Sequence, residues 1–232
     1  LSLAVSGLTS AFPVMVAALF IVGGCGGVLE AQTATVQVMT ARNEQQAGRV
    51  IAITQATFAV GALFAPIYLS LEPPGGWRGL FLILAAVSLI TVFFGVRVRS
   101  HQFNHDERES GSINWRTLAR VSVALACYVG AEVTLFGWIP TVMEYYRGIP
   151  VSRARLSPSV FWIGMLAGRL LVARLSHRIT PRMLLVASAA VSVVTATAIP
   201  FIRTEALLWI AVVAASLAAA GIWPLIVATS GS

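Results

Sequence analysis

Charged residues are scarce in this chain: only 11% of its 232 residues are Asp, Glu, Lys or Arg, whereas 57% are hydrophobic. A soluble domain of this length carries far more charge, so the composition excludes that class. The hydrophobic residues gather in long runs that are separated by polar gaps. The sequence therefore predicts an all-α membrane protein whose immediate partner is the lipid bilayer.

Cysteine and histidine are also rare, with two cysteines and three histidines in the chain. Cys25 and Cys127 lie inside apolar runs, where a small thiol packs well, and two such residues do not make a metal site. His101, His105 and His177 fall in the gaps, and the predicted spans hold no His or Asp. Because an enzyme needs a cluster of nucleophile, base or metal ligands, we expect no catalytic residues, no metal and no cofactor.

The net charge of +7 comes from arginines that lie mostly in the gaps between apolar runs. This placement indicates membrane topology, so we expect no nucleic-acid partner. The predicted spans are 13–40, 50–71, 79–96, 117–140, 157–174, 183–202 and 206–228. The first, third and fifth gaps hold ten arginines and the other gaps hold five, which places the first set on the cytoplasmic side. The five on the outer side are Arg78, Arg147, Arg153, Arg155 and Arg203.

The chain starts without Met and inside an apolar run, LSLAVSGLTSA, which is too short to cross about 30 Å of hydrocarbon. We interpret this run as the end of a helix and expect the sequence to be a fragment. Residues 97–116 are polar, charged and without apolar periodicity, which is typical of a linker. We therefore predict one helical bundle at 1–96 and a second at 117–232. The turn Leu71–Gly79 is rich in Pro and Gly and predicts two close antiparallel helices.

Two carboxylic acids, Glu30 and Glu132, lie inside apolar runs. A charged group at the centre of a span costs roughly 2.5–3.5 kcal/mol unless it faces a protein interior or a wet cavity, so each acid is a candidate functional residue. Each follows a glycine on an apolar helix, and the predicted topology makes the two helices run in opposite directions, as in inverted repeats. Each acid is a candidate proton carrier or solute ligand, with a structural hydrogen bond as the alternative.

Other polar and aromatic residues in the spans extend this candidate site. Thr33 and Gln37 lie three and seven residues after Glu30 and continue one helix face toward the cytoplasm. Tyr128 precedes Glu132 by one turn, within reach of a hydrogen bond. The remaining candidates are Gln55, Trp138 and Trp223. For the two tryptophans, packing or interfacial anchoring is the alternative role.

Arg169 is the one basic residue well inside a predicted span. It lies within about two turns of the cytoplasmic end, so we expect its side chain to snorkel to that surface. The alternative is that it balances one of the acids or an anionic substrate.

Glycines four residues apart define two small-residue helix faces, Gly23 with Gly27 and Gly164 with Gly168. Such faces let two backbones approach closely, and plain helix packing is the expected role. A sliding surface used in a conformational change is the alternative.

At these residues the chain resembles the major facilitator superfamily, and within it the fucose permease-like group of sugar and proton symporters. GGVLEAQTA resembles that group's fourth helix, and YVGAEVTLFGWIPTVM its seventh. The resemblance covers the chain from the end of the family's third helix to its tenth, and it implies that residues 97–116 are the central cytoplasmic loop. It also implies that Glu30 takes part in substrate-linked proton transfer.

Two departures from the family pattern bear on function. ARLSHRITPR, residues 173–182, resembles the cytoplasmic loop signature G-x-L-x-D-R-x-G-R-R, but His177 stands where Asp is expected. In the fifth-helix pattern of Gln followed by Asn, Gln55 matches and Phe58 replaces the Asn, which favours a different or less polar substrate. The resemblance implies a cytoplasmic gating loop that contains Arg174, His177, Arg178 and Arg182.

We therefore expect a monomeric secondary transporter in a cell membrane, with a bacterial inner membrane as the expected location. It moves a small solute, a sugar or sugar-like molecule, by alternating access coupled to a proton or to sodium. A multidrug or organic-acid exporter is the alternative, since Phe58 leaves such substrates open. A membrane receptor or scaffold is a remote alternative.

Overall fold

The computed structural model describes residues 1–41, 43–95 and 114–230. Most of the predicted linker lies outside these residues, together with Arg42, Arg97, Arg99, Arg108, His101 and His105. The described elements are α1 (Ser2–Leu8), α2 (Phe12–Thr40), α3 (Glu44–Ser70), α4 (Gly76–Gly95), α5 (Trp115–Thr141), the π-helical turn η2 (Val142–Tyr146), α6 (Val151–Ala154), α7 (Ser157–Leu175), α8 (Pro181–Ala198), the 3₁₀ turn η3 (Ile199–Phe201), α9 (Glu205–Ala219) and α10 (Ile222–Ser230).

Seven helical stretches of the described chain are long and apolar enough to cross a membrane, in the order predicted. The all-α membrane fold is thereby confirmed, and the apolar run at the start forms the short helix α1. Several boundaries differ from the prediction, since the second span begins at Gln45 and the fifth at Val151, before the predicted residues 50 and 157. The fourth span continues past Pro140 through η2 to Tyr146, and the last span, Glu205–Thr229, is divided between α9 and α10.

The chain forms two compact units, which are described separately: residues 1–30 with 72–119, and residues 31–71 with 120–232. This grouping is based on packing alone and does not test the predicted bundles, 1–96 and 117–232. In the first unit, α1 packs on α4 so closely that a Cβ at Gly7 would lie 3.1 Å from the carbonyl oxygen of Arg78. The turn before α4 uses Gly75 at φ 89°, a backbone conformation that side chains disfavour.

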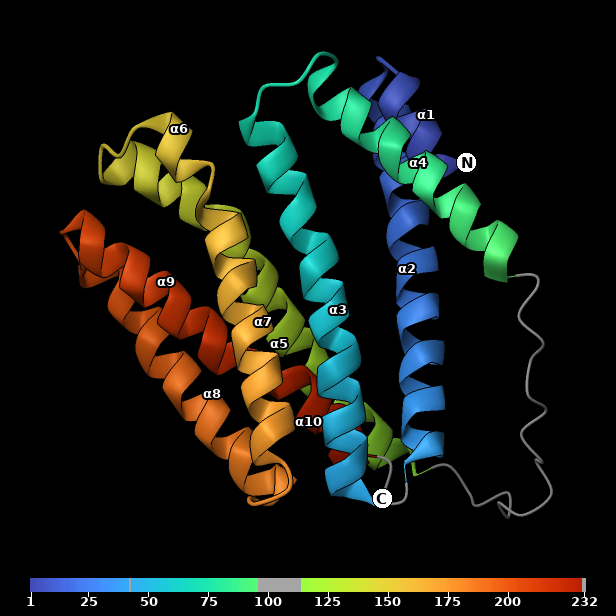
Figure 1. Cartoon of the computed structure of the whole chain (residues 1–232), viewed down its shortest axis with the longest axis vertical. Helices are drawn as coiled ribbons and strands as arrows, with labels where there is room; N and C mark the ends of the chain where they lie inside the picture. Colours follow the sequence, from blue (N-terminus) through green and yellow to red (C-terminus); the bar gives the residue numbers. More distant parts are fainter. Residues whose placement is uncertain (42, 96–113, 231–232) are drawn as a thin grey trace. The chain divides into compact units, whose positions relative to one another are not determined.

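In the second unit, α3 packs along α7, both α7 and α8 pack on α9, and α10 contacts α3 and α8. Figure 1 shows α3 beside α7, and α8 beside α9. Large side chains of α7 and α9 fill the core between them, and the fully buried ones include Phe161, Met165, Leu208 and Val212. This unit contains most of the predicted site residues.

The two glycine faces differ in their surroundings. A Cβ at Gly164 would collide with Ser216 of α9, and one at Gly168 would lie 2.6 Å from the Cβ of Ala220. This face therefore serves close helix packing, as expected. A Cβ at Gly23 or Gly27 would meet no atom of the described residues within 4 Å.

Candidate functional site

The polar face predicted at Glu30 lies on α2. Glu30 and Thr33 are exposed, whereas Gln37 is buried, with 9% of its surface accessible. Glu30 belongs to the first compact unit, and Thr33 and Gln37 belong to the second. The coupling role of these residues stays a prediction.

Glu132 lies on α5 and is half-buried. Tyr128, one turn earlier, is buried with 8% accessible surface, and the hydrogen bond expected between the two stays a prediction. Trp138 is 62% exposed, whereas Trp223 is partly buried against the core of the second unit. Of the two tryptophans, only Trp138 therefore presents a largely open ring to a solute or to lipid.

Arg169 corrects the sequence-based expectation most clearly. Its side chain is buried, with 3% accessible surface, and does not snorkel. Its Nη1 donates a hydrogen bond of 2.5 Å to the main-chain carbonyl oxygen of Gln55 on α3. Its guanidinium carbon also lies 5.8 Å from the ring centroid of Phe58 and 5.7 Å from that of Trp162. A buried cation thus joins α3 to α7.

The direction of α7 explains why Arg169 does not reach the cytoplasmic surface. Side chains on an α-helix point back toward the helix N-terminus. In the predicted topology, α7 begins on the outer side, so the side chain of Arg169 extends away from the cytoplasm. It meets the rings of α3 and α7 instead of the interfacial water.

The rings around Arg169 form an aromatic cluster of Phe58, Phe136, Phe161 and Trp162. Phe58 meets Trp162 edge-on at a centroid distance of 5.6 Å, and Phe136 lies 5.7 Å from Trp162. The sequence prediction missed Trp162, although a signal was present. Trp162 and Arg169 are seven residues apart, which places them on one helix face.

The segment that resembles the cytoplasmic signature, residues 173–182, extends from the last turn of α7 to the first turn of α8. Arg174, His177, Arg178 and Arg182 are all exposed. The loop is held by local bonds: Ser176 Oγ donates to the carbonyl oxygen of Val172 at 2.7 Å, and the Arg178 amide donates to that of Leu175 at 2.8 Å. Whether these four residues form a gating loop stays a prediction.

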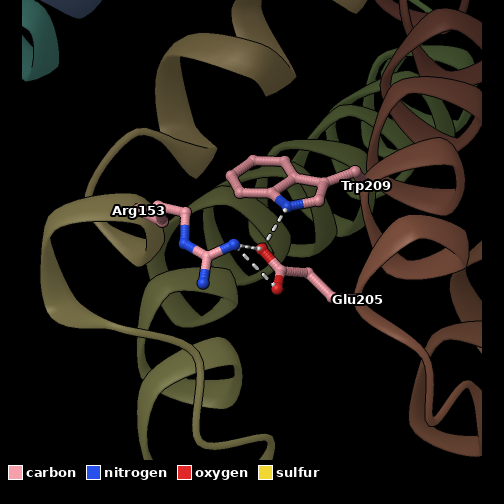
Figure 2. A network of polar contacts seen from close by, with 3 residues as sticks. All are labelled: Arg153, Glu205 and Trp209. Carbon is pink, nitrogen blue, oxygen red and sulfur yellow. Dashed lines mark hydrogen bonds and ion pairs between the residues drawn. The ribbon is translucent and has the colours of Figure 1, made fainter.

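Two of the predicted outer arginines are used in packing at the other end of the same unit. Arg153 of α6 forms an ion pair with Glu205 at the start of α9, with 2.8 Å between Nη1 and Oε1 (Figure 2). The indole nitrogen of Trp209 donates to the same oxygen at 3.3 Å. Arg147 donates to the carbonyl oxygen of Pro200 at 2.6 Å. Two of the five arginines that count against the predicted topology therefore have a structural role.

Among the described residues, no group of three or more His, Cys, Asp or Glu side chains could hold a metal ion.

The comparison with protein families covers the whole chain, residues 1–232, which match the model described as Major Facilitator Superfamily. No curated protein and no solved structure matches the chain significantly. The family match agrees with the helical fold and the seven candidate spans of the described residues. It identifies the superfamily and does not identify the narrower fucose permease-like group. The chain therefore belongs to the major facilitator superfamily, whose members are secondary transporters of small molecules across lipid bilayers and not enzymes.

Proposed function

We propose that the protein is a proton-coupled symporter of a sugar or sugar-like solute. The observation that carries this proposal is a carboxylic acid within a span on each side of residues 97–116, Glu30 on α2 and Glu132 on α5. Such acids are costly in a membrane and typically mark ion or proton pathways. Protonation on one side and release on the other then couples the solute to the proton.

The proposed mechanism is alternating access, in which two bundles rock about a site near the bilayer midplane. α3 precedes residues 97–116 and α7 follows them, so their contact joins the predicted halves. Near its start α3 also touches α10, since a Cβ at Gly48 would lie 3.6 Å from Cδ2 of Leu225. Opening toward the cytoplasm would separate these helices and break the bond between Arg169 and the Gln55 carbonyl group.

Arg169 favours a second candidate function, the export of organic acids or aromatic drugs. A buried guanidinium group beside Phe58 and Trp162 offers both a positive charge and ring faces. An aromatic carboxylate would suit these groups better than a sugar would, because a sugar needs hydrogen-bonding amides of the kind that Phe58 replaces. This candidate shares the alternating-access mechanism and differs in substrate and direction.

A substrate panel on the full-length protein in proteoliposomes tests both candidates. Sugars, organic acids and hydrophobic drugs are each offered with a pH gradient, with a sodium gradient and with neither. Accumulation of a sugar that requires the pH gradient is the expected result. Accumulation that requires the sodium gradient would identify sodium, and not the proton, as the coupling ion. Accumulation of acids or drugs alone would contradict the symporter and support the exporter.

A further inference from the structure

The predicted cytoplasmic end of the second unit carries a basic cavity to which the proposed function assigns no ligand. It has a volume of about 660 Å³ and is lined by Arg49 of α3, Arg174 of α7 and His177 of the following loop. All three side chains are exposed. No hydrogen bond or ion pair joins these side chains to another side chain that the structure describes, so two positive charges line one cavity and no described carboxylate pairs with them.

The remaining wall of this cavity is apolar and runs toward the middle of the membrane. Ile53 lies one turn beyond Arg49 along α3, and Leu170 and Ala167 lie one and two turns before Arg174 along α7. The cavity therefore presents cations at the level of the interface and hydrocarbon surface below them. This combination matches a molecule that has an anionic head and an apolar chain.

We propose that the basic cavity binds an anionic phospholipid of the cytoplasmic leaflet. Its phosphate group lies between the guanidinium groups of Arg49 and Arg174, whose planar forks suit paired hydrogen bonds to phosphate oxygens. Its acyl chain lies along Ile53 and Leu170. Basic pockets between membrane helices on the cytoplasmic side typically bind such head groups, because that leaflet is rich in anionic lipids.

The chemistry of the cavity distinguishes this ligand from two alternatives. A free inorganic phosphate would use the arginines but gain nothing from the apolar wall. A phosphatidylcholine would bring its own ammonium group close to the two guanidinium groups, which reduces the attraction. The anionic phospholipid is the ligand that uses both parts of the cavity.

Binding at this place has a consequence for conformation. The lipid would touch α3 and α7 at once, near the point where a Cβ at Gly48 would lie 3.8 Å from Ser176 Oγ. It therefore stabilises the arrangement in which these cytoplasmic ends are packed, since a ligand favours the state that it binds more tightly.

Native mass spectrometry of the purified full-length protein in detergent tests the proposal directly. Phosphatidylglycerol, phosphatidylcholine and inorganic phosphate are titrated separately against the wild type and the Arg49→Gln/Arg174→Gln variant. Arg116→Gln/Arg120→Gln is the matched control, because it removes the same charge from exposed cytoplasmic arginines of α5 that do not line the cavity. We expect phosphatidylglycerol to bind the wild type preferentially and to bind the cavity variant more weakly, by roughly fivefold for each arginine removed.

The Arg49→Lys/Arg174→Lys variant is a control for misfolding of the glutamine variant. It keeps both positive charges, so it should retain most of the phosphatidylglycerol binding. Equal weakening in the cavity variant and the matched control would overturn the proposal, since it would show a general charge effect. Equal binding of phosphatidylcholine and phosphatidylglycerol would overturn it as well. Binding of inorganic phosphate as tightly as the lipid would assign the cavity to a soluble anion instead. None of these outcomes depends on transport activity.

Discussion

The arginines at the two ends of the second unit are used in opposite ways. At the predicted outer end, Arg147 and Arg153 bond to a carbonyl oxygen and a carboxylate of the protein. At the predicted cytoplasmic end, Arg49 and Arg174 line a cavity and have no such partner among the described residues. Between the two ends, Arg169 is buried and joins α3 to α7. Arginine side chains thus bond to other parts of the protein, link two helices or line an open cavity, according to their depth and neighbours.

The largest stability effect is expected at the buried position. Arg169→Ala removes a charged hydrogen bond to Gln55 and two cation–π contacts, so the free energy of unfolding should fall by roughly 2–4 kcal/mol. Thermal unfolding in detergent measures this loss. Arg169→Lys should recover only part of the stability, because an ammonium group lacks the planar face that stacks on rings. An unchanged unfolding temperature in Arg169→Ala would mean that the link between α3 and α7 carries no stability.

A smaller effect is expected for Arg147. Arg147→Ala removes its hydrogen bond to the Pro200 carbonyl group, which should lower the free energy of unfolding by about 1 kcal/mol. The same thermal measurement applies, with Arg203→Ala as an exposed outer control that makes no such bond in the described residues. Equal losses in both variants would remove the distinction between bonded and unbonded outer arginines.

The ion pair of Arg153 and Glu205 is expected to contribute less, because the side chain of Arg153 is 56% exposed and that of Glu205 is 34% exposed. A double-mutant cycle with Arg153→Ala and Glu205→Ala should give a coupling energy of about 0.2–1 kcal/mol that falls as salt is added. A coupling energy as large as the effect of Arg169→Ala would contradict the ranking by burial. The indole of Trp209 is a third member of this network, so the cycle should be repeated with Trp209→Phe.

The smallest effect is expected at the cytoplasmic cavity. In lipid-free detergent, Arg174→Gln should change the free energy of unfolding by less than about 0.5 kcal/mol, since no described partner is lost. Added phosphatidylglycerol should then raise the unfolding temperature of the wild type more than that of the variant. A large loss without lipid would show that Arg174 has a structural role, as Arg147 has.

The spans were predictable from the sequence because a membrane requires long apolar helices, and hydropathy registers their length directly. The position of Arg169 was not predicted correctly. Its depth can be read from the sequence, but the direction of its side chain depends on the polarity of α7 and on the rings that α3 places opposite. Phe58 was recognised as a departure from a family pattern, whereas its contact with Trp162 depends on the packing of two distant segments.

The glycine faces give a similar lesson. The spacing of Gly164 and Gly168 predicted close helix approach, and their contact with α9 confirms it. The identical spacing of Gly23 and Gly27 predicted the same, yet no described residue approaches them within 4 Å. Spacing defines a helix face, but the partner of that face depends on tertiary packing.

The central claim, proton coupling through Glu30 and Glu132, is tested most directly by proton entry during solute uptake. Proteoliposomes of the full-length protein with a pH-sensitive dye inside receive the transported solute of the panel. Glu144→Gln is the matched control, because Glu144 lies in the turn η2 at the outer end of the same span as Glu132. We predict that solute acidifies the lumen for the wild type and Glu144→Gln, and that Glu30→Gln and Glu132→Gln lose this response. Uptake that stays fully proton-coupled in both of these variants would contradict the account.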